Sequence, residues 1–124
     1  MPTTAEELVL QHWQAANQRD WHRFSAVLGA DVVYEVPQTR ERVRGRANYL
    51  EFFQTWPGNW RAEIVQLIAD ERAAVSTIEF VTDQGRETGI SFFEVSDGLI
   101  TRITDYWPAP YDPPQRMTHC VERY

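Results

Sequence analysis

Residues 87–107, ETGISFFEVSDGLITRITDYW, decide the fold class of this chain. Asp97-Gly98 near their centre is the strongest β-hairpin signal in the sequence, because this dipeptide suits the tight turn between two antiparallel strands. β-Branched and aromatic residues flank the dipeptide on both sides, as is typical of strands. The stretch therefore predicts two antiparallel strands, over residues 87–96 and 99–107.

Two further strands are predicted upstream, over residues 60–69 and 73–82. Side chains in a strand alternate between the two faces of the sheet, so one inward residue fixes the facing of its neighbours. We expect one face of this sheet to point into the domain. That inner face carries Glu79, Ser91, Phe93, Asp105 and Trp107.

The opposite face of the predicted sheet also carries large apolar side chains, which are Ile78, Phe80, Ile90, Phe92 and Tyr106. Helices can cover one face only, and a large apolar surface left in water marks an interaction site. We therefore predict a homodimer packed sheet to sheet through this face. The alternative is a monomer that leaves a few apolar side chains exposed.

The first half of the chain has helical spacing. Thr4 and Glu7 form a capping box that starts one helix. Asp20 caps a second helix that Gly29 ends, and a third spans about residues 46–55. Between them, residues 31–36 predict a strand that Pro37 ends, and residues 38–45 a polar loop. Helices followed by an antiparallel meander predict an α+β domain, with three helices on one face of the sheet.

The length of 124 residues predicts a single domain over residues 1–124. Its folded core spans about residues 5–107, and a proline-rich tail, residues 108–124, follows in extended form over the surface. The net charge of −6 argues against nucleic acid or an anionic membrane as a partner. The sequence contains no run of about 18 apolar residues and no signal peptide, so we expect a cytoplasmic protein.

Metal and cofactor chemistry is not expected. All basic residues are Arg, which excludes a lysine Schiff base, and Cys120 is the only cysteine. His12, His22 and His119 lack the spacing of metal ligands. No glycine-rich phosphate loop points to a nucleotide cofactor.

At this point the pattern resembles a known family. The elements of the chain follow one order, which is two helices, then Asp31-x-x-Tyr34-x-x-Pro37, then Val43-x-Gly45 opening a helix, and finally Asp97-Gly98-x-Ile100-x-x-Ile103-x-Asp105-Tyr106-Trp107. With this order the chain resembles the nuclear transport factor 2-like superfamily, and its SnoaL-like branch in particular. The resemblance covers about residues 5–107. It implies a cone, in which a curved antiparallel or mixed sheet wraps a pocket and the helices cover its concave face. Members include polyketide cyclases, ketosteroid isomerases, epoxide hydrolases, dehydratases and non-catalytic modules, so the fold alone does not choose a function.

The ketosteroid isomerase pattern is not met. Its catalytic Asp falls on Val36, its oxyanion Tyr on His12 and its oxyanion Asp on Ser91, whereas its pocket Trp matches Trp107. The resemblance still makes Ser91 a candidate substrate-binding residue.

The epoxide hydrolase pattern is met in part. Asp105 and Glu79 occupy its two acidic positions, but Thr77 stands at its Arg position. The SnoaL-type cyclases use an inward Asp on the last strand as acid or base, and Asp105 resembles that residue.

Four residues are candidates for catalysis: Asp105 as general acid or base, with Glu79, Tyr34 and His12 orienting water or a substrate oxygen. Each has a structural alternative. Asp105 could pair with an Arg or accept backbone hydrogen bonds, and Glu79 could bond to Tyr34 or His12. Tyr34 could be a satisfied core tyrosine, and His12 a core histidine with one hydrogen bond.

Aromatic residues are candidates for the wall of a ligand pocket, and they are Trp13, Phe53, Trp56, Trp60, Phe93 and Trp107. The sequence thus predicts a small-molecule-binding protein that carries out cofactor-free cyclisation, isomerisation, dehydration or hydrolysis on a largely apolar, oxygenated substrate. The alternative is a non-catalytic ligand-binding or dimerisation module of the same fold.

Overall fold

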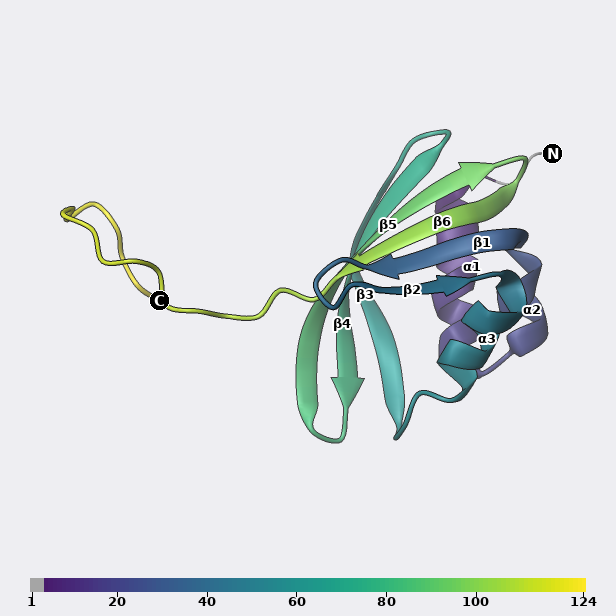
Figure 1. Ribbon diagram of the computed structural model, residues 1–124, viewed down its shortest axis with the longest axis horizontal. Coiled ribbons are helices and arrows are strands. Elements are labelled where there is room, and N and C mark those ends of the chain that lie inside the picture. The colour runs from purple at the N-terminus through teal and green to yellow at the C-terminus, as the bar shows by residue number, and fades with distance from the viewer. Residues whose placement is uncertain (1–3) are drawn as a thin grey trace.

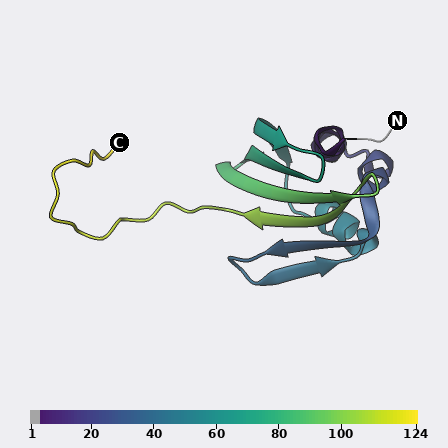
Figure 2. The same ribbon diagram turned by 90° about the horizontal axis from the view of Figure 1, so that it is seen from above.

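A curved, mixed sheet of six strands carries three helices on its concave face, as Figures 1 and 2 show. The computed structural model describes residues 4–124. Its elements are α1 (Ala5–Gln18), α2 (Trp21–Ala26), β1 (Leu28–Val36), β2 (Glu41–Arg44), α3 (Arg46–Gln54), β3 (Trp60–Ala69), β4 (Ala73–Thr82), β5 (Gly85–Ser96) and β6 (Leu99–Tyr106). This architecture is the α+β cone that the sequence predicts.

The helices begin where their capping residues predict. Thr4 Oγ1 accepts a hydrogen bond of 3.1 Å from the backbone N–H of Glu7 and starts α1. Asp20 does the same for Arg23 at the start of α2, at 3.2 Å. Each cap supplies an acceptor to an N–H group that has no partner within its own helix.

The strands follow the order β2-β1-β6-β5-β4-β3 across the sheet. β3 to β6 form the predicted antiparallel meander, while β1 pairs parallel to β6 and antiparallel to β2. The register shifts between Ile64 and Gln66, where β3 pairs with β4, and again between Glu94 and Val95 of β5. Such bulges bend a strand and increase its twist, which suits a sheet that wraps a cavity.

Two local expectations in the first half of the chain are wrong. Gly29 does not end a helix, because β1 already begins at Leu28, which pairs with Ile100 of β6. The polar loop over residues 38–45 contains the edge strand β2, whose Val43 pairs with Tyr34. An edge strand needs no apolar alternation, so composition alone misses β2.

The facing of β4 is also opposite to the expectation. Ile78 is fully buried, and Phe80 packs against the core on the concave face, so neither belongs to the predicted outer surface. Ile78 pairs with Gly89, and residues opposite each other in a sheet share a face. Glu79, one position away, therefore lies on the convex face.

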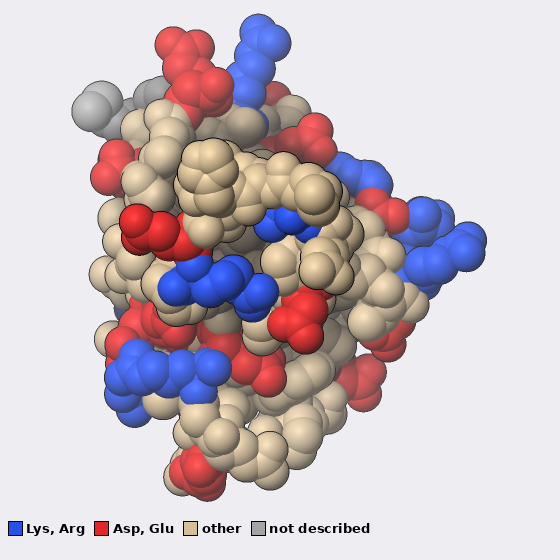
Figure 3. Space-filling view, turned by 90° about the vertical axis from the view of Figure 1, so that its left-hand side faces the viewer, with Lys and Arg blue, Asp and Glu red and all other residues tan. Residues whose placement is uncertain are grey.

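The proline-rich tail contains no helix or strand and extends away from the domain, rather than over its surface (Figure 1). Tyr111, Met117 and Tyr124 are exposed along it. Viewed from the side on which the tail projects, acidic and basic side chains are mixed over the surface (Figure 3). None of the helices over residues 4–124 is long and apolar enough to cross a membrane.

Candidate active site

The sheet and helix α3 enclose a cavity of about 300 Å³ that is partly open to solvent. This volume lies at the lower end of the range for small-molecule sites, roughly 300 to 1,000 Å³. All six strands contribute to its wall, together with α1 and α3. The lining residues are Trp13, Tyr34, Val36, Thr39, Glu41, Phe52, Phe53, Trp56, Trp60, Phe80, Glu87, Asp105 and Trp107.

Asp105 is the most deeply buried acidic group in this wall. It lies on β6 opposite Ser91 of β5, and only 4% of its surface is exposed. Tyr34 Oη donates a hydrogen bond of 2.6 Å to Oδ2. The other oxygen, Oδ1, is buried and has no hydrogen-bond partner among residues 4–124, and no Arg of that range forms an ion pair with the carboxylate. The described chain therefore leaves one oxygen of this cavity-lining residue without a hydrogen bond.

Burial sets the acidity of this carboxylate. Loss of water contact raises the pKa of Asp105 from 3.8 to about 6. The hydroxyl of Ser91, which lies on the neighbouring strand without a hydrogen bond to the carboxylate, and the hydrogen bond from Tyr34 act in the opposite direction. At neutral pH the carboxylate is then mostly ionised, but it takes up a proton readily. A group poised in this way suits general acid or base catalysis.

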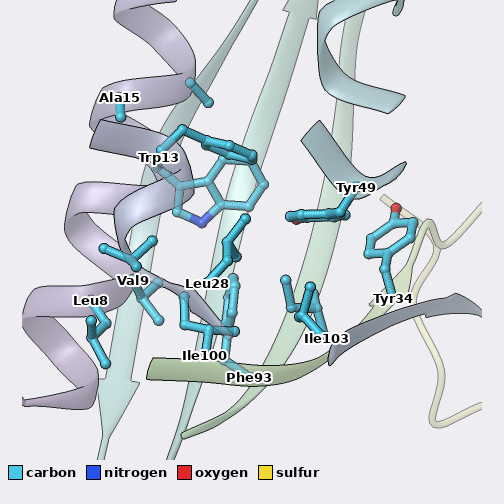
Figure 4. Packing of buried hydrophobic residues seen from close by; sticks show 14 of the residues in the cluster. Leu8, Val9, Trp13, Ala15, Leu28, Tyr34, Tyr49, Phe93, Ile100 and Ile103 are labelled. Atoms are coloured by element: carbon cyan, nitrogen blue, oxygen red, sulfur yellow. The ribbon is translucent and has the colours of Figure 1, made fainter. Parts of the chain in front are cut away.

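Tyr34 holds Asp105 in place. Its ring lies between α3 and the sheet, 5.1 Å from that of Tyr49 between centroids, and Figure 4 shows the two side by side. Burial, followed by the charge of Asp105, raises the pKa of Tyr34 far above its usual value. The phenol therefore stays protonated and remains a hydrogen-bond donor.

Trp107 forms part of the cavity wall at the end of β6. The Gln38 side chain donates to the backbone carbonyl of Trp107 at 3.1 Å and accepts a hydrogen bond from its N–H, which fixes the start of the tail. A Cβ atom on Gly89 would lie 2.8 Å from the indole ring. The absence of a side chain at Gly89 is therefore what lets the indole lie against the sheet.

His12 is a core residue behind the wall rather than part of it. It is fully buried, its Nε2 lies 2.8 Å from Tyr49 Oη, and its Nδ1 has no partner among the described residues. Burial lowers the pKa of His12 from 6.5 to about 3, so the ring is neutral. This geometry matches the alternative of a core histidine with one hydrogen bond.

Glu79 does not reach the cavity, and its predicted place beside Asp105 is wrong. It lies on the convex face of β4, opposite Glu63 of β3 and Thr88 of β5. Thr88 Oγ1 donates a hydrogen bond of 3.2 Å to it. Thr77 shares that outer face, so of the three positions of the epoxide hydrolase pattern only Asp105 falls on the cavity.

Most of the predicted aromatic wall is brought together. Trp13, Phe53, Trp56, Trp60 and Trp107 line the cavity, and the Trp13 indole N–H donates to Ser76 Oγ at 3.1 Å. Ser91 and Phe93 are buried on the same inner face but do not line the cavity.

Sequence reasoning missed six residues of the wall, of which Val36 and Thr39 are small and four are aromatic or acidic. Phe52 and Phe80 are aromatic and were not placed at the pocket, and Glu41 and Glu87 are acidic residues at its rim. The pairing of β4 with β5 across their hairpin would have placed two of them, Phe80 and Glu87, on the inner face. Phe80 pairs with Glu87, and Ile78 with the inward Gly89, so the whole set faces inward together.

The described residues contain no group of side chains that could bind a metal ion. Among residues 4–124, no three His, Cys, Asp or Glu side chains lie close enough to hold one ion. The three acidic residues of the wall therefore do not form a metal-binding group.

A curved sheet closed by helices over an aromatic-lined cavity defines a cone domain of the nuclear transport factor 2-like class. The chain belongs to the SnoaL-like domain family, whose model matches residues 9–103. No curated protein matches it in sequence.

Solved structures show the same architecture. A proposed ketosteroid isomerase from Kribbella flavida DSM 17836 is 42% identical with a TM-score of 0.90, and the match covers 96% of this chain and 88% of that one. An LEH-like epoxide hydrolase from M. tuberculosis is 27% identical with a TM-score of 0.70, covering 84% and 82%. A proposed polyketide cyclase from Pseudomonas putida KT2440 is 26% identical with a TM-score of 0.70, covering 86% and 92%. These neighbours carry different reactions in their names, so they support the family and not one chemistry.

Proposed function

We propose that this protein binds a small, largely apolar molecule bearing a carbonyl or hydroxyl group, and that Asp105 transfers a proton to or from it without a cofactor. The observation that carries the proposal is the buried Oδ1 of Asp105, which has no partner among the described residues and belongs to a side chain that lines an aromatic cavity. A buried polar atom without a partner is costly, and a substrate that hydrogen-bonds to it removes that cost.

The roles of the neighbouring groups follow from their contacts. Tyr34 holds Oδ2, so the carboxylate presents Oδ1 to the substrate in a fixed orientation. As a base, Asp105 would remove a proton from a carbon or hydroxyl held at Oδ1, and as an acid it would return that proton to an oxygen. Cyclisation, isomerisation, dehydration and hydrolysis all contain such a transfer.

One observation favours the alternative of a non-catalytic binding module. Of the three residues expected to assist Asp105, Tyr34 alone reaches the cavity, because Glu79 lies on the convex face and His12 behind the wall. In that case Asp105 would act as a hydrogen-bond acceptor for a ligand that leaves unchanged.

The catalytic role can be tested with 5-nitrobenzisoxazole, an activated probe that a carboxylate base opens. Oδ1 takes the proton of the ring carbon, the N–O bond breaks, and its electron pair stays on oxygen as 2-cyano-4-nitrophenolate. We expect the protein to accelerate this step over free acetate, with a rate that rises with pH and levels off above about pH 6. Asp105→Asn should lower kcat/KM by about a hundredfold or more, a typical loss for a general base.

The matched control is Glu79→Gln, which removes the same charge from the opposite face of the sheet and should keep the rate. Binding of the phenolate product to each variant is followed separately, by quenching of the tryptophans in the wall. A rate that survives Asp105→Asn, with binding unchanged, would favour the binding module. No rate above that of acetate would contradict the catalytic role itself.

We also propose that the protein forms a homodimer through the convex face. Ile68 and Phe92 are exposed there, and Phe92 packs edge-on against Tyr106 with ring centroids 5.8 Å apart. Cross-strand pairing places Ile90 beside Tyr106 and Val75 between Ile68 and Phe92, so the apolar surface is continuous.

Sedimentation at micromolar concentration should show a species of twice 14.5 kDa. Phe92→Asp should shift it to the monomer, whereas Met117→Asp, on the exposed tail, should not. A 14.5 kDa species alone in the unaltered protein would refute the dimer.

A further inference from the structure

The cavity is acidic as well as aromatic. Glu41, Glu87 and Asp105 line it from three different strands, and no Arg or His side chain is among its lining residues. The chain contains no Lys. A site built for an anion would place cationic side chains at this wall, and none of the residues 4–124 does so.

Two acidic residues of the convex face form ion pairs with Arg, unlike those of the cavity wall. Glu35 pairs with Arg42 and Arg102, and Glu63 pairs with Arg61 and Arg86. Glu41 and Glu87 form no ion pair with any residue of 4–124. Arg therefore pairs with Glu35 and Glu63 on the outer face, whereas no Arg of the described chain pairs with an acidic residue of the cavity wall.

Eight of the thirteen lining residues are aromatic. The face of an aromatic ring carries negative electrostatic potential and attracts cations, most strongly where water is excluded. One ring already shows this preference, because the Arg19 guanidinium lies 3.9 Å from the centroid of the Trp60 ring, although Arg19 is not part of the cavity wall.

Asp105 adds an independent observation that points to a ligand. Its carboxylate is 4% exposed, and its Oδ1 has no hydrogen-bond partner within the described chain. The acidic residues do not converge on one point as they would around a metal ion. Acidic residues that share one cavity with eight aromatic rings fit a larger cation whose charge is distributed over carbon and nitrogen.

We propose that the ligand of this cavity carries an organic cation, a substituted ammonium or amine, which lies among the aromatic rings and faces Asp105, with Glu41 and Glu87 at the rim. This inference rests on the proposed function only in taking the cavity as the ligand site. It does not require that Asp105 transfer a proton.

Three probes of equal size and different charge test the inference. They are benzyltrimethylammonium, its neutral carbon isostere neopentylbenzene, and the anionic benzylsulfonate, with binding followed by tryptophan fluorescence and calorimetry at pH 7.5 and low salt. We expect the cation to bind about tenfold or more tighter than the neutral isostere, and the anion most weakly, from cation–π contacts and the unbalanced carboxylates together.

Matched variants separate local from overall charge. Glu41→Gln and Glu87→Gln should each weaken binding of the cation about threefold, leave the neutral isostere unchanged, and show an effect that shrinks as salt is added. Glu79→Gln changes the net charge equally, on a carboxylate that also lacks an Arg partner but lies on the convex face. It should leave the affinity for all three probes unchanged.

Each outcome decides between the two proposals. Tighter binding of the cation, reduced in the Glu41 and Glu87 variants and kept in the Glu79 variant, supports the inference. Equal or tighter binding of the neutral or anionic probe overturns it and leaves the cavity as a small-molecule site. An equal loss in all three variants shows a general effect of charge and also overturns it. If no probe binds, both the inference and the ligand-binding function are contradicted.

Discussion

The two faces of the sheet carry acidic residues in opposite environments. On the convex face, Glu63 is bound by Arg61 and Arg86, whose hydrogen bonds lower its pKa. On the concave face, burial raises the pKa of Asp105, and no Arg of the described chain accompanies it. The first arrangement stabilises a charge in water, whereas the second keeps a reactive charge out of it. The difference indicates that the concave face is organised for binding and chemistry, not for stability alone.

The largest effect that we expect is a difference in unfolding free energy between substitutions of two isoleucines on adjacent strands. Ile78→Ala removes a fully buried side chain from the concave face and should cost about 2–5 kcal/mol of unfolding free energy. Ile90→Ala, on the convex face, should cost less and should instead weaken dimerisation. Chemical denaturation at two protein concentrations checks both, since only the second change depends on concentration. Equal costs at both positions would contradict the assignment of the faces.

A smaller effect concerns the pH dependence of stability. The folded-state pKa of Asp105 is raised from 3.8 to about 6, so its contribution is full below about pH 4 and is lost as pH rises through about 6. Asp105→Asn does not titrate. Relative to the unaltered protein, this variant should gain about 2 kcal/mol between pH 4 and pH 7.

The stability of Asp105→Asn is compared with that of the unaltered protein at each pH, because His12 also changes the stability over this pH range in both proteins. Its lowered pKa contributes stability above about pH 6.5 that is lost as pH falls, in both proteins alike. Urea denaturation at a series of pH values measures the difference. A stability difference that stays constant from pH 4 to pH 7 would contradict the burial of the Asp105 carboxylate.

The smallest effect is expected at the ion pairs of the convex face. Glu35→Gln breaks contacts with Arg42 and Arg102, which are partly in water, so it should cost about 0–1 kcal/mol. The cost should fall as salt is added, because screening weakens exposed pairs. Thermal denaturation with and without 0.5 M salt, about three to four times physiological ionic strength, measures it. A large, salt-independent loss would show that this face is not simply solvated.

Much of the fold could be predicted from the sequence, because local chemistry fixes it. Asp97-Gly98 sets the turn between β5 and β6, and alternation along each strand then gives the shared inward facing of Asp105 with Trp107 and of Ser91 with Phe93. The bulge between Glu94 and Val95, which brings Ser91 opposite Asp105, could not be read from that turn. The capping residues Thr4 and Asp20 likewise locate the starts of two helices. Asp105, Tyr34 and most of the aromatic wall are therefore correct in position.

The facing of β4 could not be taken from apolar alternation alone, since both of its faces carry apolar residues. Thr82 pairs with Gly85 across a two-residue turn, and that register, rather than hydrophobicity, places Ile78 and Phe80 inward and Glu79 outward. Strand β2 was missed for a related reason, because a short polar edge strand has no apolar signature. Glu41 and Glu87 enter the cavity wall only through those tertiary pairings.

The chemistry proposed for the concave face depends on one acidic group, Asp105, whose pKa lies near neutrality. The most direct measurement is the titration of the Asp105 side-chain carboxyl carbon by ¹³C NMR, with the signal assigned by its loss in Asp105→Asn. We predict a midpoint at about pH 6, shifted from the ordinary value of 3.8. A midpoint at or below that ordinary value would show a solvated or paired carboxylate and would contradict the account.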